Sequence, residues 1–228
     1  MTSPSGATLL THDANAPERR VLFPWGRFVA LAFLAVWLPT YTVYWGWRNF
    51  LHLCDVTVFL TVLAIWRSDV RLLSGQAVAA LLVNLLWVVD AGGRILVGRH
   101  LIGGTEYMWN AHYPLFLRAL SLFHVALPLV LIAALRRTGY HRGGFTVAYV
   151  TVAILFVVCF IVGTPVENLN YVLRDPFMHR PLGPPLVHLA ITIAAFTVLG
   201  LYPTHLLLRA VLPRAKAPPL PGQPQTAG

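Results

Sequence analysis

Residues 117–135, LRALSLFHVALPLVLIAAL, form an apolar stretch with three polar side chains inside it. A helix of this length would be about 28 Å long, close to the ~30 Å thickness of bilayer hydrocarbon. Arg118, Ser121 and His124 follow one another at spacings of three, so they would share one face of that helix. Polar side chains are costly against lipid tails, and we therefore expect this face to contact protein or water.

Further apolar blocks of similar length predict an all-α polytopic membrane protein. Of the 228 residues, 57% are hydrophobic and 11% are charged, whereas about a quarter of the residues of a soluble domain are charged. We predict a bundle of six transmembrane helices in one domain, 23–212, with spans near residues 28–44, 50–66, 72–91, 113–135, 145–163 and 186–208. Pro203 is expected to kink the sixth span. Residues 97–112 are expected to form an interfacial loop, and residues 1–22 and 213–228 a disordered lead and tail.

The distribution of basic residues predicts the orientation in the membrane. The net charge of +9 comes from Arg and Lys residues that lie singly or in pairs between apolar blocks, without a basic patch interleaved with aromatic residues. This pattern fits lipid headgroups as the partner rather than nucleic acid. Six spans place both termini on one side, which holds eleven of the 17 basic residues. The bias predicts a cell-membrane protein with both termini in the cytoplasm.

This topology brings the polar residues of separate spans to the outer half of the membrane. The second span begins there, the third ends there, and the fifth and sixth are joined there, which gathers His52, Cys54, Asp55, Asp90, Arg94, Glu167, Asn168, Asn170 and His188. We expect Asp90 and Arg94 to pair on a last helical turn, because they are four residues apart. His52 and Asp55 share a helical face, so the carboxylate is expected to orient the imidazole. His124, about 16 Å into its span, needs a partner from another helix or from water.

Three classes of function fit this set, and they remain open at the level of sequence. The first is hydrolysis or transfer of lipid acyl groups, which needs a nucleophile, a base and an orienting group. The catalytic candidates are His124, His52, Asp55, Cys54 and Glu167, with Thr57 as a further hydroxyl, and the substrate-binding candidates are Arg118, Ser121, Asn168, Asn170 and His188.

The second class is a non-enzymatic membrane protein, such as a proton- or ion-coupled carrier or an assembly factor, in which the same polar groups form a path or hold helices together. The third is a metal-binding enzyme, with ligands from His52, Asp55, His124, Glu167 and His188. No spacing among these residues matches a metal motif, so we expect neither a metal nor another cofactor. A purely structural role, in snorkelling side chains or a loop cap, is the alternative for Arg118 and for the segment 167–170.

Two segments carry a resemblance to a known family. FLHLCD at residues 50–55 resembles the start of a helix in the androgen-induced family of multipass intramembrane hydrolases, and SLFHVALPLVLI at 121–132 resembles its histidine-bearing segment. The resemblance implies hydrolysis of hydroxy-fatty-acid esters with His124 as the histidine. The family's threonine falls at or beside His52, so Cys54 or Thr57 would have to replace it, as in related membrane acyltransferases that use cysteine and histidine. LSLFH, Gly139-Tyr140 and ENLNY resemble segments of bacterial multipass membrane proteins without an assigned activity.

Overall fold

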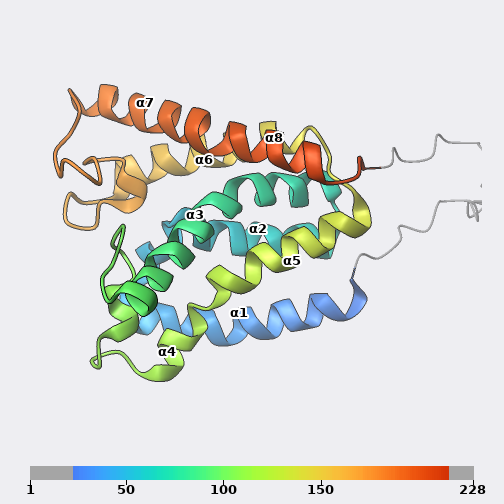
Figure 1. The fold of residues 1–228 in the computed structure, drawn as a ribbon, viewed down its shortest axis with the longest axis horizontal. Helices are drawn as coiled ribbons and strands as arrows, with labels where there is room; N and C mark the ends of the chain where they lie inside the picture. Colours follow the sequence, from blue (N-terminus) through green and yellow to red (C-terminus); the bar gives the residue numbers. More distant parts are fainter. Residues whose placement is uncertain (1–22, 216–228) are drawn as a thin grey trace, which may run out of the picture.

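The structure is a computed structural model that describes residues 23–215, and the regular elements in this range are all helical (Figure 1). In chain order they are α1 (Pro24–Trp45), η1 (Trp47–Leu51), α2 (Leu53–Arg67), α3 (Val70–Val97), η2 (Glu106–Trp109), α4 (Leu115–Leu120), α5 (Phe123–Thr138), α6 (Gly144–Val162), η3 (Leu169–Tyr171), α7 (Pro185–Phe196), η4 (Thr197–Leu201) and α8 (Tyr202–Val211). The prediction of an all-α fold is confirmed.

Five stretches of the described chain are long and apolar enough to cross a membrane. They are Pro24–Trp45, Val70–Val97, Leu115–Thr138, Gly144–Val162 and Pro185–Val211. The predicted second span differs, because α2 has only 15 residues and is therefore about 22 Å long. Its predicted first turns form the separate 3₁₀ helix η1, and His52 between the two helices has an extended backbone, with φ −66° and ψ 141°.

Two of the long stretches are interrupted where the backbone hydrogen-bonding pattern changes. The predicted fourth span is split into α4 and α5 at Ser121 and Leu122, whose N–H groups bond three residues back rather than four. The last stretch contains a π-helical turn, η4, between α7 and α8. This turn ends two residues before Pro203, whose missing N–H leaves the Leu199 carbonyl without its α-helical donor. The sequence-based expectation of a disturbance near Pro203 therefore corresponds to η4.

Helix α3 lies at the centre of the bundle and packs against α2, α5 and α6 (Figure 1). Small residues allow the close approach to α6, because an added Cβ on Gly75 would come within 2.4 Å of a Val147 methyl carbon. On the other side, the fully buried indole of Trp37 joins α1 to its neighbours. It contacts rings from α1, η1, α2 and α5, namely Phe33, Tyr41, Phe50, Phe59 and Phe123.

The connections between helices divide the molecule into two ends (Figure 1). The described chain starts and finishes at one end, called here the terminal end, together with the α2–α3 turn and the α5–α6 loop. The opposite end, called here the long-loop end, holds η1 and the connections 98–114 and 163–184. Of the predicted tail, residues 213–215 are described and pair with Tyr140, while the predicted lead and residues 216–228 lie outside the described range.

Candidate functional site

Asp55, in the first turn of α2, is the buried carboxyl with the fewest partners among the described acidic residues. Its side chain is 2% exposed. One carboxyl oxygen accepts a hydrogen bond from the Asn49 amide at 2.8 Å, and the other lies 3.8 Å from the Cys54 thiol. No Arg, Lys or His of the described chain forms an ion pair with it. Removing its proton would therefore leave a buried negative charge without a cation.

We expected Asp55 to orient the His52 imidazole, but the structure gives His52 a different partner. Its Nδ1 donates to the Asn49 carbonyl at 2.9 Å, while the Asn49 side chain donates to Asp55. Asn49 therefore links His52 and Asp55, since its carbonyl binds the first and its side-chain amide binds the second. The imidazole is thus held by a backbone carbonyl beside the start of α2.

His124 and Ser121 lie at the break between α4 and α5. At the break, the Ser121 carbonyl accepts two hydrogen bonds from His124, one from its backbone N–H at 3.1 Å and one from Nδ1 at 2.8 Å. The imidazole is 7% exposed and stacks on Trp87 of α3, with ring centroids 4.6 Å apart and planes 7° from parallel. With its hydrogen on Nδ1, the neutral ring has Nε2 as an acceptor. His124 therefore contacts protein, as expected, but its partners are an aromatic ring and a backbone carbonyl.

Arg118 does not share in this contact, although sequence spacing placed it on the same face. Its guanidinium donates to the Met108 carbonyl at 2.9 Å and so attaches α4 to the connection 98–114. The prediction of one continuous helical face is wrong, because the helix breaks after Leu120, between Arg118 and His124.

Three aromatic residues that we did not predict complete the cluster. The Tyr41 hydroxyl lies 2.6 Å from the Ser121 hydroxyl, and Trp87 donates to the Tyr107 hydroxyl at 3.0 Å. Burial raises the pKa of Tyr107 to about 12, and the nearby Cys54 and Asp55 add to that rise. Tyr41 lies near the end of an apolar helix but is only 2% exposed. We call Asn49, Asp55, Tyr41, Tyr107 and Ser121, with His124 beside them, the polar cluster.

The segment after α6 holds the start of α2, the helix that carries Asp55. Asn170 accepts from the Leu53 N–H at 2.9 Å and donates to the Leu51 carbonyl and the Cys159 sulfur at 2.7 and 3.2 Å. It thereby supplies the cap that α2 lacks at His52. Asn168 binds backbone groups of its own loop at Leu173 and Arg174. Both asparagines therefore have structural partners.

Glu167 and His188, two other predicted site residues, are also engaged in structural contacts. Glu167 pairs with Arg48 at 3.1 Å, and this bond, with Thr164, lowers the pKa of the exposed carboxyl. Both ring nitrogens of His188 are occupied, since Leu182 donates to Nδ1 at 3.2 Å and Nε2 donates to the Tyr171 carbonyl at 3.1 Å. His188 therefore holds the connection 163–184 in place rather than presenting a free imidazole.

The expected pair of Asp90 and Arg94 is wrong. Helix α3 continues to Val97, and Arg94 donates to the Gly98 carbonyl instead. Asp90 binds the connection 98–114 with both oxygens, accepting from two backbone N–H groups, Ile102 at 2.7 Å and Gly103 at 2.8 Å, and from the Thr105 hydroxyl. His100 Nδ1 lies 3.0 Å from the same carboxyl. Asp90 thus anchors the loop that carries Tyr107.

Within residues 23–215, no group of three or more His, Cys, Asp or Glu side chains is close enough to hold a metal ion. The five ligands considered from sequence are spread over separate hydrogen-bonded contacts. No family model, curated protein or solved structure matches this chain. Inference about function therefore depends on the geometry of the polar cluster.

Proposed function

We propose that this chain is a multipass membrane protein with six membrane helices, in which the polar cluster carries protons or cations across part of the bundle. The five long apolar stretches support the membrane assignment by length and composition. Large apolar side chains remain exposed on them, for example Val29, Leu129, Ile154 and Leu199, each more than 60% exposed. A surface of this kind matches lipid tails better than water. Helix α2 is enclosed by α1, α3 and α5, so its shorter length is compatible with a position inside the bundle.

The arrangement of charges supports the orientation that we predicted from sequence. Eight arginines of the described chain belong to the terminal end, Arg27, Arg67, Arg71, Arg136, Arg137, Arg142, Arg209 and Arg214, and six belong to the long-loop end. By the positive-inside rule the terminal end would face the cytoplasm, and the polar cluster would open to the outer side.

Asp55 is the observation that carries the proposal of proton or cation coupling. Burial makes a negative charge on this carboxyl costly, while the N–H groups in the first turn of α2 favour one. These opposing effects make both charge states accessible, provided that a proton or cation accompanies the change. Buried intramembrane carboxyls with this property mark proton and ion pathways in pumps and transporters.

The other acidic residues of the described chain do not have this character. Asp69 accepts from the Leu72 N–H at the start of α3, Glu167 pairs with Arg48, and Asp90 has four donors. Asp55 alone combines complete burial with a single N–H donor, and it lies close enough to Tyr41 and Tyr107 for its charge to act on their hydroxyls.

Proton flux into liposomes tests the proposal. The purified protein would be reconstituted with a pH-sensitive dye inside, and a potassium diffusion potential would drive protons inward. We expect wild type and Asp55→Glu to acidify the interior faster than protein-free liposomes do, and Asp55→Asn to fall to the protein-free rate. Asp69→Asn removes the same charge at the terminal end and should keep the wild-type rate.

Either of two results would refute a proton path through Asp55. Wild-type protein that conducts no faster than empty liposomes would exclude a proton path, and equal flux in wild type and Asp55→Asn would exclude Asp55 from it. Size-exclusion profiles and helix content of each variant separate loss of function from loss of fold.

Acyl hydrolysis or transfer is the second candidate, favoured by one observation. The bond from His124 Nδ1 to the Ser121 carbonyl leaves Nε2 as the acceptor that a general base requires. However, the Ser121 hydroxyl is paired with Tyr41, and the Cys54 thiol points to Asp55. A serine- or thiol-reactive activity probe should label wild type and lose labelling in His124→Ala if this function holds. Labelling that persists in the variant would exclude it.

A further inference from the structure

A second polar region lies at the terminal end, remote from the polar cluster. Here the last described residues cross the α5–α6 loop, since Tyr140 N–H donates to the Pro213 carbonyl at 2.6 Å and Ala215 N–H donates to the Tyr140 carbonyl at 3.0 Å. Gly139 permits this crossing, because it has φ +81° and an added Cβ would lie 2.5 Å from the Ala215 nitrogen. The crossing fixes Arg214 beside Tyr140.

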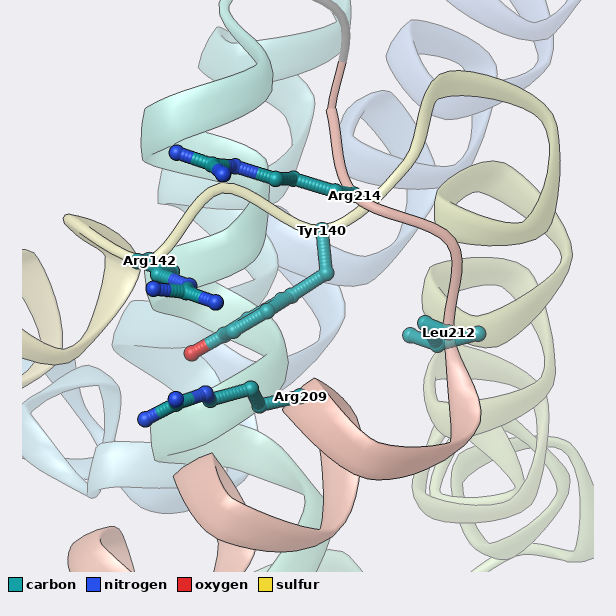
Figure 2. A pocket seen from close by; sticks show the side chains of 5 residues that line it. All are labelled: Tyr140, Arg142, Arg209, Leu212 and Arg214. Atoms are coloured by element: carbon teal, nitrogen blue, oxygen red, sulfur yellow. The ribbon is translucent and has the colours of Figure 1, made fainter.

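These segments enclose a pocket lined by Tyr140, Arg142, Arg209, Leu212 and Arg214 (Figure 2). Tyr140 and Leu212 are buried and form its base, whereas the three arginines are exposed. Figure 2 shows the side chains of Arg142 and Arg209 on either side of the Tyr140 hydroxyl. The arginines come from the α5–α6 loop, the last turn of α8 and the chain beyond it.

The charge in this pocket has no counterpart in the described chain. None of its arginines forms an ion pair or a side-chain hydrogen bond with another described residue. The one acidic residue of the terminal end within residues 23–215 is Asp69, and its carboxylate caps α3. Like charges held together by the backbone repel one another, so an anion that binds them all would be stabilising.

The guanidinium groups and the Tyr140 hydroxyl are suitable donors to the oxygens of a phosphate group. A guanidinium presents planar N–H donors that fit phosphate geometry, and several of them together favour a multiply charged anion. Burial raises the pKa of Tyr140 to about 12, so its hydroxyl keeps its hydrogen at neutral pH. That hydroxyl lies 2.6 Å from His205 Nδ1. When His205 carries its hydrogen on Nδ1, the phenol accepts from the ring and can donate to an anion.

From this geometry we infer that Arg142, Arg209 and Arg214, with the Tyr140 hydroxyl between the first two, form a binding site for a phosphate group. Helix α8, which carries Arg209, also has exposed apolar side chains, including Leu207 and Val211, so a lipid headgroup and a soluble phosphorylated compound can each present the phosphate there. The inference does not depend on the function of Asp55.

Binding would be measured on the purified full-length protein in a zwitterionic detergent. One arm titrates inorganic phosphate and pyrophosphate, and the other adds phosphatidic acid or phosphatidylglycerol, with phosphatidylcholine as the uncharged control lipid. The readouts are thermal stabilisation and lipid adducts in native mass spectrometry. Removing two charged donors in Arg142→Gln/Arg209→Gln should weaken binding by about 100-fold. Arg67→Gln/Arg136→Gln, which removes equal charge at the same end, should weaken it by less than about threefold.

Each outcome decides the inference. Binding of soluble phosphate and lipid, or of either one alone, with loss in the pocket variant supports the site and identifies the source of the phosphate. No binding in both arms overturns it, as does an equal loss in the pocket and control variants, which would indicate general surface charge. Tyr140→Phe, which keeps the buried ring, provides an independent variant and should weaken binding by about tenfold.

Discussion

Asn170 offers a sharp test of how the long-loop end is held together. Its side chain replaces the missing N-cap of α2 by accepting from Leu53 N–H, and its backbone has φ +51°. Replacing it with alanine leaves the buried Leu53 N–H unpaired, at a cost of about 1 to 3 kcal/mol. The left-handed backbone adds about 1 kcal/mol, because alanine lacks the short polar side chain that lets asparagine adopt this conformation. We therefore expect Asn170→Ala to lower the free energy of unfolding by about 3 kcal/mol.

Equilibrium unfolding in mixed micelles, followed by circular dichroism, measures this loss. Asn170→Gly removes the same hydrogen bonds without the backbone strain, so it should lose about 1 kcal/mol less than the alanine variant. Asn110→Ala is the matched control, because its side chain makes one local bond to the His112 N–H in an exposed loop. If Asn170→Ala and Asn110→Ala lose the same free energy of unfolding, the proposed cap is wrong.

Three further predictions address other parts of the fold. Gly144→Ala should destabilise the protein by about 1 to 3 kcal/mol, because the new Cβ would lie 2.7 Å from Ser74 Cβ. Gly92 has open space around it, so Gly92→Ala should be neutral or stabilising. Unfolding curves of the two variants measure the difference. His188→Ala should lower the free energy of unfolding by about 2 to 4 kcal/mol, because it leaves the Leu182 N–H and the Tyr171 carbonyl without partners. A variant that unfolds like wild type would show that these bonds are unimportant. The Arg48 bond depresses the folded-state pKa of Glu167, so its stabilising contribution is present above the ordinary glutamate pKa and is lost as the pH falls through the depressed value. Unfolding measured from pH 7 to pH 3 should therefore show a smaller acid-induced loss in Glu167→Gln, and identical profiles would contradict the assignment.

Hydropathy and residue spacing predicted the helices well, because apolar length is a local property of the sequence. The break at Ser121 was not predicted, because nothing in the sequence of residues 117–135 marks it. The residues that contact this region come from other helices: Trp87 of α3 stacks on the His124 ring, and Tyr41 of α1 contacts the Ser121 hydroxyl. The conformation of residues 117–135 therefore depends on tertiary packing.

The polar residues at the long-loop end illustrate the same limit. Topology alone brought Glu167, Asn170 and His52 to one end of the bundle, and the structure places them there. Which groups pair was not predictable, because it depends on the folding of the connections 98–114 and 163–184. Asp90 bonds to backbone N–H groups more than ten residues away rather than to Arg94. The burial of Tyr41 was not predictable either, because an aromatic residue near the end of an apolar helix has the same local sequence whether it faces lipid or the core.

The most direct test of the account is the accessibility of single cysteines in intact cells. His112 is exposed at the long-loop end and Arg136 is exposed at the terminal end, so His112→Cys and Arg136→Cys report on opposite ends of the bundle. We predict that a membrane-impermeant maleimide labels His112→Cys from outside, and labels Arg136→Cys only after the membrane is permeabilised. Equal labelling of both variants in intact cells, or labelling of Arg136→Cys alone, would contradict a bundle that spans the membrane with its polar cluster toward the outer side.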